Sequence, residues 1–515
     1  MRETGNTFPS KLIRNASGSS LRRVAAIAGT VAALAGCTVG PDYTRPEIPL
    51  PSHFANAGAA RELPFRASPS LDQWWNGFHD PVLINIVRHA VSQNLDIQAA
   101  EARVRQSQAM AREAGTDYLP QGLLNADLES QQQSLLSPEG KIASQFPDYT
   151  RDQTVRQIDV GATWELDLAG GLRRRARAYL DEAQAAQAAH FGVRVSVSAE
   201  AADAYFQIRG ANTCIALLKT QIGVDRQILL LVGEQVTQGI ATNRDEADAQ
   251  VTLAADSADL AEYRNASTVQ SDRLDVLMGD AAGTHRFHLA TLDDESWMTP
   301  GIPADIHPAE LLRRRPDVIA AERHLAAATE NIGVAVSQYY PSISLAGLFG
   351  FERLGAGGLV VNAAFQPMML TGIHWRLFDF GKVDAEIAAA HGKREEVLFT
   401  YRQAVLRATE DVEDALSTLA KVDIQRRQRQ RVADADAQSW RSIDQSLQAG
   451  ASSMVDVLKR KRDLLMAKRA VAINRSDRAR STVGVFRTLG GGWPSDQVQT
   501  AMPHVASRSP AKASP

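Results

Sequence analysis

Two hydrophobic periods alternate along the chain. From Ile158 to Leu166 every second residue is apolar and the residues between are polar or glycine, which predicts a strand with one apolar face. No proline occurs from Gly171 to Gly239, and apolar residues in this segment recur near heptad spacing, as in a packed coiled coil. The heptad series comprises Leu218, Ile222, Leu229, Val232 and Val236. The pattern therefore predicts long helices that alternate with short runs of strand.

The same pattern is present twice. The windows that end at Pro120 and Pro341 correspond at an offset of 221 residues (341 − 120), and Trp164 and Trp375 correspond at an offset of 211 (375 − 164). The pairs that keep the offset of 211 are Gly239 and Gly450, Asp245 and Asp456, and Gly279 and Gly490. A register kept over such a distance indicates a duplication. The first copy then carries ten extra residues (221 − 211) between its proline and its tryptophan.

Each copy reads as helix, β-hairpin, long helix, turn and helix. In the second copy Pro316 suits the first turn of a helix, and Pro341 ends that helix because proline disfavours the helical conformation of the residue before it. Alternating residues follow in both copies. The apolar faces are Leu124, Ala126 and Leu128 in the first outgoing strand, Ile343, Leu345, Phe349 and Phe351 in the second, and Thr371, Ile373, Trp375 and Leu377 in the second return strand.

Strands of roughly ten residues with one apolar face fit a membrane β-barrel, although a half-buried hairpin of a soluble protein is the alternative. Two hairpins supply only four strands, and an open sheet edge in lipid leaves costly unpaired backbone groups. Closure would therefore require three copies (4 × 3 = 12 strands). The proline-free segments Gly171–Gly239 and Gly381–Gly450 would then form helices of ~100 Å that continue from this barrel.

These elements define the expected organisation of the chain, which is mainly α with a membrane β-barrel. The expected segments are a signal peptide at 1–36, a lipid-anchored linker at 37–81, the first repeat at 82–279, an equatorial linker at 280–307, the second repeat at 308–493 and a disordered tail at 494–515. The hairpins are expected at about 119–167 and 342–379, and the helix-reversing tips near Gly239 and Gly450.

The amino-terminal segment has the composition of an export signal. Arg22 and Arg23 precede the apolar run VAAIAGTVAALAG (24–36), which leads to Cys37. The sequence LAGC (34–37) predicts that Cys37 is lipidated, with an ordinary signal peptide as the alternative. Several acyl chains anchor a protein firmly to a membrane. Cys214, the other cysteine, lies in a helical pattern and is expected to be a buried thiol.

Composition narrows the possible functions. The 515 residues include 56 basic and 59 acidic side chains, and this near balance argues against a nucleic-acid-binding protein. The sequence contains no run of about 18 uncharged apolar residues, so we expect no helix that spans a membrane. The chain has no Walker A, HExxH or GxSxG motif. We therefore expect no enzyme, no metal site and no cofactor beyond the covalent lipid on Cys37.

The chain resembles TolC-like outer-membrane factors, specifically the lipoprotein branch called the NodT family. The resemblance extends from Cys37 to Trp493 and rests on several ordered stretches: CTVGPDYTRPEIPLP (37–51), WWNGFHDPVL (74–83), RRPDVIAAERHLAAA (314–328), HWRLFDFGK (374–382) and LGGGW (489–493). It implies a homotrimer with a 12-stranded barrel in the outer membrane and an α-helical barrel across the periplasm. It also implies docking to a periplasmic adaptor protein and an inner-membrane pump, commonly of the resistance-nodulation-division type.

The two tips are the candidate functional site. Glycine permits the left-handed backbone at which a helix reverses, and the tips of related channels meet the adaptor. The tip residues are Gly239, Ile240 and Ala241 in the first copy and Gly450, Ala451 and Ser452 in the second. The resemblance suggests Asp245 and Asp456 as residues of a closed entrance, and Lys459 stands where some relatives have a second acid. The plainer interpretation is that both aspartates stabilise the first turn of a helix.

Three classes of function remain open at this stage. The leading hypothesis is a passive exit duct for small molecules, the outer-membrane component of a tripartite efflux pump. Within this class, a type I protein-secretion channel is the alternative. A non-channel structural lipoprotein of the cell envelope and a lipoprotein hydrolase are hypotheses of other classes. The basic runs RRQRQR (426–431) and KRKR (459–462) are interpreted as solvated helix faces or as adaptor contacts.

Overall fold

The computed structural model describes residues 38–56, 58, 68–285, 298–303 and 307–494. The expected signal peptide, the lipidated Cys37, part of the equatorial linker and nearly all of the carboxyl-terminal tail lie outside the described residues.

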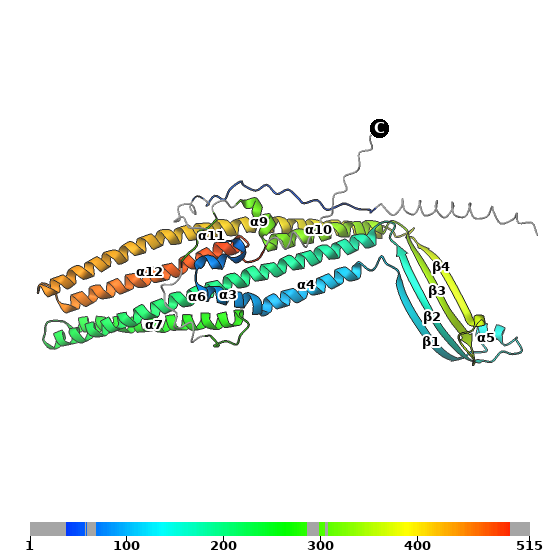
Figure 1. Cartoon of the computed structure of the whole chain (residues 1–515), viewed down its shortest axis with the longest axis horizontal. Helices are drawn as coiled ribbons and strands as arrows, with labels where there is room; N and C mark the ends of the chain where they lie inside the picture. Colours follow the sequence, from blue (N-terminus) through cyan, green and yellow to red (C-terminus); the bar gives the residue numbers. More distant parts are fainter. Residues whose placement is uncertain (1–37, 57, 59–67, 286–297, 304–306, 495–515) are drawn as a thin grey trace, which may run out of the picture. The chain divides into compact units, whose positions relative to one another are not determined.

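The four longest helices form two pairs, with one member of each pair in each repeat (Figure 1). Helices α6 (Gly171–Thr237) and α11 (Lys382–Gln448) have 67 residues each, and α7 (Asn243–Leu277) and α12 (Met454–Thr488) have 35 each. Other helices of the described residues are η1 (Leu71–Phe78), α3 (Pro81–Gln93), α4 (Leu95–Ala114), α9 (Pro308–Arg314) and α10 (Pro316–Ser337). The long helices predicted from the absence of proline are confirmed, as is the start of α10 at Pro316.

The two hairpins combine into one antiparallel sheet with the order β1-β2-β3-β4. Its strands are β1 (Gln121–Gln132), β2 (Asp152–Leu166), β3 (Ser342–Leu354) and β4 (Phe365–His374). The first connection contains α5 (Pro138–Ala143), whereas the second contains only the three-residue helix η2 (Asn362–Ala364). The extra residues of the first copy therefore lie in a longer hairpin connection.

Cross-strand pairing confirms the two predicted faces of the sheet. Val160 pairs with Leu124 on one side and Phe349 on the other, which extends an apolar row across three strands. These apolar side chains face outward from the single chain, because Leu124 is 64% exposed, Phe349 63% and Met369 81%. Within the described part of the chain, β1 and β4 each have an edge without a partner strand.

The return strand of the second copy is shorter than its alternation suggested. We predicted that Trp375 and Leu377 continue its apolar face, but β4 ends at His374. β4 ends there because His374 pairs with Ser342, the first residue of β3, and Trp375 has no partner residue on that strand. Asp379 then caps the start of α11 by accepting hydrogen bonds from the backbone nitrogens of Gly381 (3.1 Å) and Val383 (3.0 Å).

By its internal contacts the chain divides into two compact units, and each unit contains parts of both repeats. The first comprises Met1–Thr44, Ser107–Glu182 and Leu325–Val397 and includes the sheet. The second comprises Arg45–Gln106, Ala183–His324 and Leu398–Pro515 and includes both tips. The duplicated halves are therefore intertwined, and neither repeat is a compact unit by itself. Among the described residues, no helix has both the length and the hydropathy to cross a bilayer.

The core of the second unit is built around aromatic side chains. Trp74 is fully buried and stacks on Phe486 with an interplanar angle of 8°. Trp75 meets Trp74 edge-on, and Trp493 stacks on Phe191 at 18°. Trp74 and Trp75 therefore both pack in the interior of this unit. This core joins the amino-terminal helices to the end of the second repeat.

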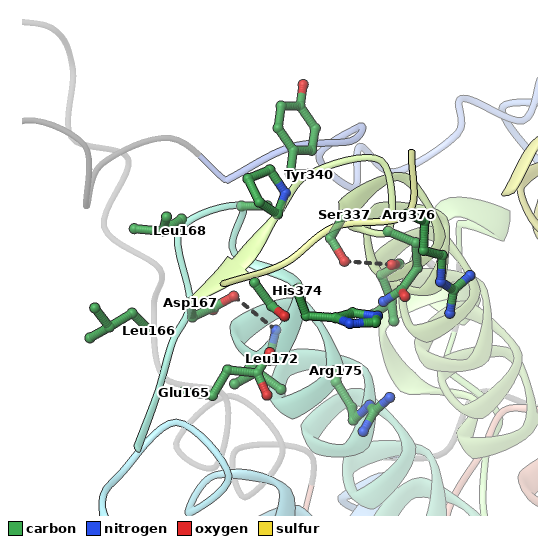
Figure 2. Close-up of a pocket in the computed structure, with 16 residues that line it drawn as sticks. Glu165, Leu166, Asp167, Leu168, Leu172, Arg175, Ser337, Tyr340, His374 and Arg376 are labelled. Carbon is green, nitrogen blue, oxygen red and sulfur yellow. Dashed lines mark hydrogen bonds between the residues drawn. The ribbon is translucent and has the colours of Figure 1, made fainter. Parts of the chain in front are cut away.

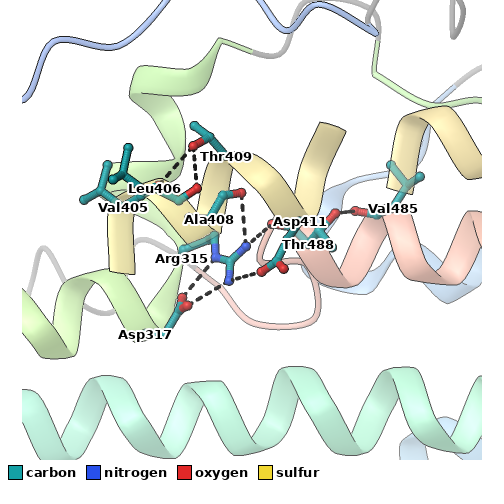
Figure 3. A network of polar contacts seen from close by, with 9 residues as sticks. All are labelled: Arg315, Asp317, Val405, Leu406, Ala408, Thr409, Asp411, Val485 and Thr488. Carbon is teal, nitrogen blue, oxygen red and sulfur yellow. Dashed lines mark hydrogen bonds and ion pairs between the residues drawn. The ribbon is translucent and has the colours of Figure 1, made fainter. Parts of the chain in front are cut away.

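Arg315 connects three helices of the second unit (Figure 3). Its guanidinium group donates to the carboxylate of Asp317 at 2.7 Å and to that of Asp411 at 2.9 Å. It also donates to the backbone carbonyl oxygens of Ala408 at 3.3 Å and Thr488 at 3.4 Å. One planar cation thereby ties the start of α10 to α11 and to the end of α12.

A glycine makes room for a buried carboxylate inside the sheet. Asp159 is buried on the polar face, where it accepts hydrogen bonds from Asn125 Nδ2 (3.1 Å) and Gln157 Nε2 (2.8 Å). Its partner on β3 is Gly350, and a Cβ at that position would lie 2.6 Å from the carbonyl oxygen of Ile158. A side chain at position 350 is therefore incompatible with the pairing of β2 and β3.

We predict that Gly350→Val disrupts the β2–β3 pairing, whereas Gly347→Val on the same strand is tolerated. A Cβ at Gly347 would meet only Phe349, at 4.0 Å. Circular dichroism of both variants in detergent would show a loss of β signal for the first and wild-type β signal for the second. Equal spectra would contradict this account of the sheet.

Candidate functional site

Both tips reverse the chain through a glycine in the left-handed conformation. Gly239 has φ 73° and Gly450 has φ 75°. In the first tip the nitrogen of Ile240 donates to Gln235 O at 2.8 Å, and in the second the nitrogen of Ala451 donates to Ser446 O at 2.8 Å. Such a bond, which spans the last turn of the helix, is the usual way to end a helix at a left-handed glycine. Position by position, the two copies use the same turn.

The helices that leave the tips begin with matching capping boxes. Thr242 Oγ1 accepts from the nitrogen of Asp245 (3.3 Å), and Asp245 Oδ2 accepts from the nitrogen of Thr242 (2.8 Å). Ser453 and Asp456 repeat this exchange at 3.1 and 3.3 Å. The two aspartates thus satisfy backbone donors that every helix start leaves without a partner. This supports the interpretation that they stabilise the first turn.

The capping contacts also hold both aspartates in the ionised form. The hydrogen bond from the Ser453 hydroxyl keeps the pKa of Asp456 below its ordinary value, and the Thr242 hydroxyl does the same for the pKa of Asp245. The positive charge of Lys459 lowers the pKa of both carboxyl groups further. Among the three gate candidates, Lys459 therefore lies within electrostatic reach of both tip aspartates.

Apolar packing between α6 and α12 holds the two tips side by side. Val224, Ile228 and Val232 of α6 form one cluster with Val455, Leu458 and Leu465 of α12. Ala241 packs against this cluster, whereas Ile240 is strongly exposed. The cluster is consistent with the predicted heptad face, since Val232 belongs to both. The exposed tip residues remain available to a partner protein.

A small pocket lies where the strands meet the helices (Figure 2). Its volume is about 120 Å³, and its lining includes Glu165, Arg175, His374 and Arg376. Asp167 accepts hydrogen bonds from the backbone nitrogens of Leu172 (3.2 Å) and Arg173 (3.0 Å) and so fixes the start of α6. The sequence patterns missed this pocket because its lining comes from three separated segments. Charges of both signs in so small a space favour a structural role.

The duplication is visible in single contacts at this junction. Trp164 Nε1 donates to the carbonyl oxygen of Tyr118 at 3.0 Å, and Trp375 Nε1 donates to that of Tyr339 at 3.0 Å. Both indole rings are exposed at the base of the sheet. Aromatic side chains with a polar tip are typical of the rims of membrane barrels.

The segment that follows Cys37 is bound to the first unit by a buried arginine. Arg174 is almost fully buried, forms an ion pair with Glu330 at 2.9 Å and contacts Asp42 at 2.9 Å. It also donates to the carbonyl oxygens of Val39 and Gly40, each at 3.2 Å. We call these contacts of Arg174 with Val39, Gly40, Asp42 and Glu330 the arginine clamp. No sequence pattern predicted it, beyond the resemblance of the stretch that begins at Cys37.

Two close approaches complete this docking site. The nitrogen of Val39 donates to the carbonyl oxygen of Ala169 at 3.0 Å. A Cβ at Gly40 would lie 2.5 Å from the Cα of Gly333, so the segment lies directly against α10. Residues 38–42 are therefore held in one conformation by both repeats.

Comparison with known proteins identifies the family. The chain matches the family described as Outer membrane efflux protein over residues 86–280 and 307–491. It belongs to this family. The two matched segments follow the two repeats, and the break between them falls in the expected equatorial linker. This efflux protein is accordingly an outer-membrane component of an efflux system that extends into the periplasm, as the resemblance implied.

Curated relatives share most of their length with this efflux protein. The pyoverdine export outer membrane protein OpmQ of Pseudomonas aeruginosa is 29% identical over 87% of this chain and 94% of the relative. Nodulation protein T of Rhizobium leguminosarum bv. trifolii is 27% identical over 85% of this chain and 91% of the relative. These matches confirm the resemblance to the NodT branch.

A solved structure of an outer-membrane channel shares the fold. The channel OprN superimposes with a TM-score of 0.77, at 28% sequence identity, over 89% of this chain and all of the OprN chain. The expected fold class, mainly helical with two repeats that each contribute a hairpin, is thereby confirmed. OpmQ is named as an export outer-membrane protein and OprN as an outer-membrane channel, and none of these three proteins is described as an enzyme.

We predict that Ser453→Ala speeds hydrogen exchange in the first turn of α12, because loss of a cap costs about 1 kcal/mol. In the wild type, the contribution of Asp456 is present above its ordinary pKa of 3.8 and is lost as pH falls below that value, since its folded-state pKa is depressed. The variant should lose part of this acid dependence. Ser452→Ala, outside the capping box, is the matched control and should exchange like the wild type.

Proposed function

We propose that three copies of this chain close a 12-stranded barrel in the outer membrane, continued by an α-helical barrel that forms a passive exit duct. The observation that carries the proposal is the sheet itself. Its apolar face is exposed in the single chain, and both of its outer edges lack a partner strand among the described residues. In lipid, an open edge is costly and only closure removes it. Three identical four-stranded sheets meet this requirement.

The energy for transport would come from partner proteins. The sequence has no Walker A motif, so the duct is expected to be passive. Membership of the efflux family supports a tripartite assembly with a periplasmic adaptor and an inner-membrane pump, which we expect to be of the resistance-nodulation-division type. The exposed tip residues around Gly239 and Gly450 are the proposed contact surface for the adaptor.

A covalent lipid on Cys37 would supply a second attachment to the membrane. The arginine clamp supports this proposal, because it fixes residues 38–42 on the unit that contains the sheet. The lipid would then be attached directly before a segment that is fixed on this unit. Acyl chains add roughly 0.8 kcal/mol for each buried methylene, so they would reinforce the barrel's own insertion.

Small molecules are the proposed cargo. OpmQ is named for pyoverdine export, and the relative TtgF of Pseudomonas putida, 26% identical, is named for toluene efflux. These names favour small-molecule efflux over the alternative of a type I protein-secretion channel. The sequence itself does not specify the cargo.

The proposed entrance combines charges of both signs. If Asp245 and Asp456 face the bore, the neighbouring Lys459 weakens the attraction of an acidic ring for cations. We therefore propose a weakly selective entrance in place of the cation preference that two acids alone would give. The capping role of both aspartates holds whether or not they face the bore.

We predict that Met369→Arg prevents assembly of the membrane-inserted trimer, whereas Met368→Arg on the opposite face of β4 is tolerated. A cation on a lipid-facing position near the bilayer centre costs about 2–4 kcal/mol. Mass measurement of the particles purified in detergent distinguishes the variants. A stable, water-soluble monomer of the wild type would overturn the proposed closure.

We also predict that Gly450→Trp weakens coupling to the adaptor, because a bulky residue at a positive φ distorts the tip. Gly450→Asn is the matched control, since asparagine tolerates the left-handed conformation. Efflux from whole cells and crosslinking to the adaptor should fall for tryptophan and stay near wild type for asparagine. Unchanged crosslinking in Gly450→Trp would exclude this tip as the contact.

A further inference from the structure

Two buried aspartates face each other between α6 and α7, above the first tip. Asp225 of α6 is 2% exposed and lies 14 residues before Gly239 (239 − 225). Asp256 of α7 is 8% exposed and lies 17 residues after that glycine (256 − 239). Both belong to the second compact unit. Aspartates are almost never buried unless they are paired, so this position requires an explanation.

The hydrogen bonds around the pair are incomplete. Gln221 Nε2 donates to Asp256 Oδ2 at 2.5 Å. In the described part of the chain neither carboxylate oxygen of Asp225 accepts a hydrogen bond from any donor. Two ionised carboxylates would repel each other here, and one of them would remain unsatisfied, which is strongly unfavourable in the interior.

Arg462 on α12 does not fully neutralise the two aspartates. Arg462 of α12 faces Asp225 and favours its ionised form. Arg462 Nη2 also lies 4.0 Å from Oδ1 of its neighbour Asp463. Its Nε donates to no acceptor among the described residues. One positive charge therefore faces two carboxyl groups, and a single additional positive charge would balance the cluster.

We propose that Asp225 and Asp256 share one proton, which joins α6 to α7 by a carboxyl–carboxylate hydrogen bond, and that loss of this proton loosens the helix pair above the first tip. With the proton in place, Asp225 gains the hydrogen bond that it otherwise lacks, and the net charge of the two aspartates and Arg462 is zero. Two carboxyl groups in direct contact hold one proton more tightly than an isolated carboxyl group does.

The electrostatic environment agrees with this arrangement. Burial is the largest cause that raises the pKa of Asp225, to about 7, followed by the hydrogen bond to Asp256 and the negative charge of Asp256. Arg462 acts in the opposite direction. Because the folded-state pKa lies above the ordinary value of 3.8, the stabilisation is complete below pH 3.8. This stabilisation declines as pH rises from 3.8 to about 7, and it does not change further above that pH.

The pair lies beside the apolar cluster that joins the tips. Val224, adjacent to Asp225 in sequence, and Ile228 pack against Leu458 and Leu465 of α12. A second negative charge at Asp225 would therefore appear at the edge of an apolar interface. Loosening at this point affects both the α6–α7 pair and its contact with α12.

The second repeat provides an internal control. The offset of 211 aligns Asp225 with Asp436 (225 + 211) and Asp256 with Ala467 (256 + 211). Ala467 is buried in α12. The second copy therefore cannot form the carboxyl pair, and the α11 segment around Asp436 should show no pH response of its own.

The experiment is hydrogen exchange of the full chain between pH 5 and pH 8, compared with the Asp225→Asn variant at each pH so that intrinsic exchange cancels. The asparagine amide can donate to Asp256 and does not titrate. Relative to this variant, we expect protection of α6 and α7 near the pair to fall roughly a hundredfold in the wild type across this range, because about two pH units separate pH 5 from the folded-state pKa of about 7. The α11 segment around Asp436, which has no such pair, should show no such change.

Three further arms make the outcome decisive. Asp256→Asn should also abolish the pH response, and it replaces Asp225→Asn if that variant does not fold. Asp436→Asn is the matched control and should behave like the wild type. Equal pH responses in the wild type and both pair variants would overturn the proposal. Recovery of protection in the wild type at pH 8 on addition of sodium or calcium chloride would also overturn it, because the ligand would then be a metal cation.

Discussion

Backbone hydrogen bonding in the absence of water is the constraint on which the rest of the structure depends. The strands β1 to β4 satisfy one another internally, but the two outer edges offer rows of donors and acceptors that a bilayer cannot satisfy. The apolar face of the same sheet is exposed in the single chain, and its contact with water would be unfavourable. A four-stranded sheet with these properties is complete only as part of a closed assembly, and the proposed trimer follows from this requirement.

The duplication gives that assembly two similar helix pairs with different chemistry. The turns at Gly239 and Gly450, their capping boxes and the tryptophan contacts at the base of the sheet are the same in both copies. The carboxyl pair of Asp225 and Asp256 occurs in the first copy alone, because alanine occupies one of the equivalent positions in the second. Equal geometry with unequal charge allows the two tips to respond differently to the same conditions.

Much of the site could be predicted from the sequence, since its residues are close together along the chain. The tips, their glycines and the aspartates Asp245 and Asp456 follow from local turn and cap chemistry within about ten residues. The arginine clamp could not be predicted in the same way. Arg174, Glu330 and Asp42 are separated by more than a hundred residues, and only the packing of α6 against α10 brings them together.

The sequence by itself determined the helix and strand periods, the duplication and the positions of the turns, because each depends on side-chain spacing and on the local conformations open to glycine and proline. The tertiary structure alone decided which carboxyl groups are buried, that β4 ends before Trp375, and that the charge of Lys459 acts on both tip aspartates. These features depend on distances between separate helices, and no local pattern encodes such distances. Burial and charge proximity arise only when the helices pack and water is removed from between them.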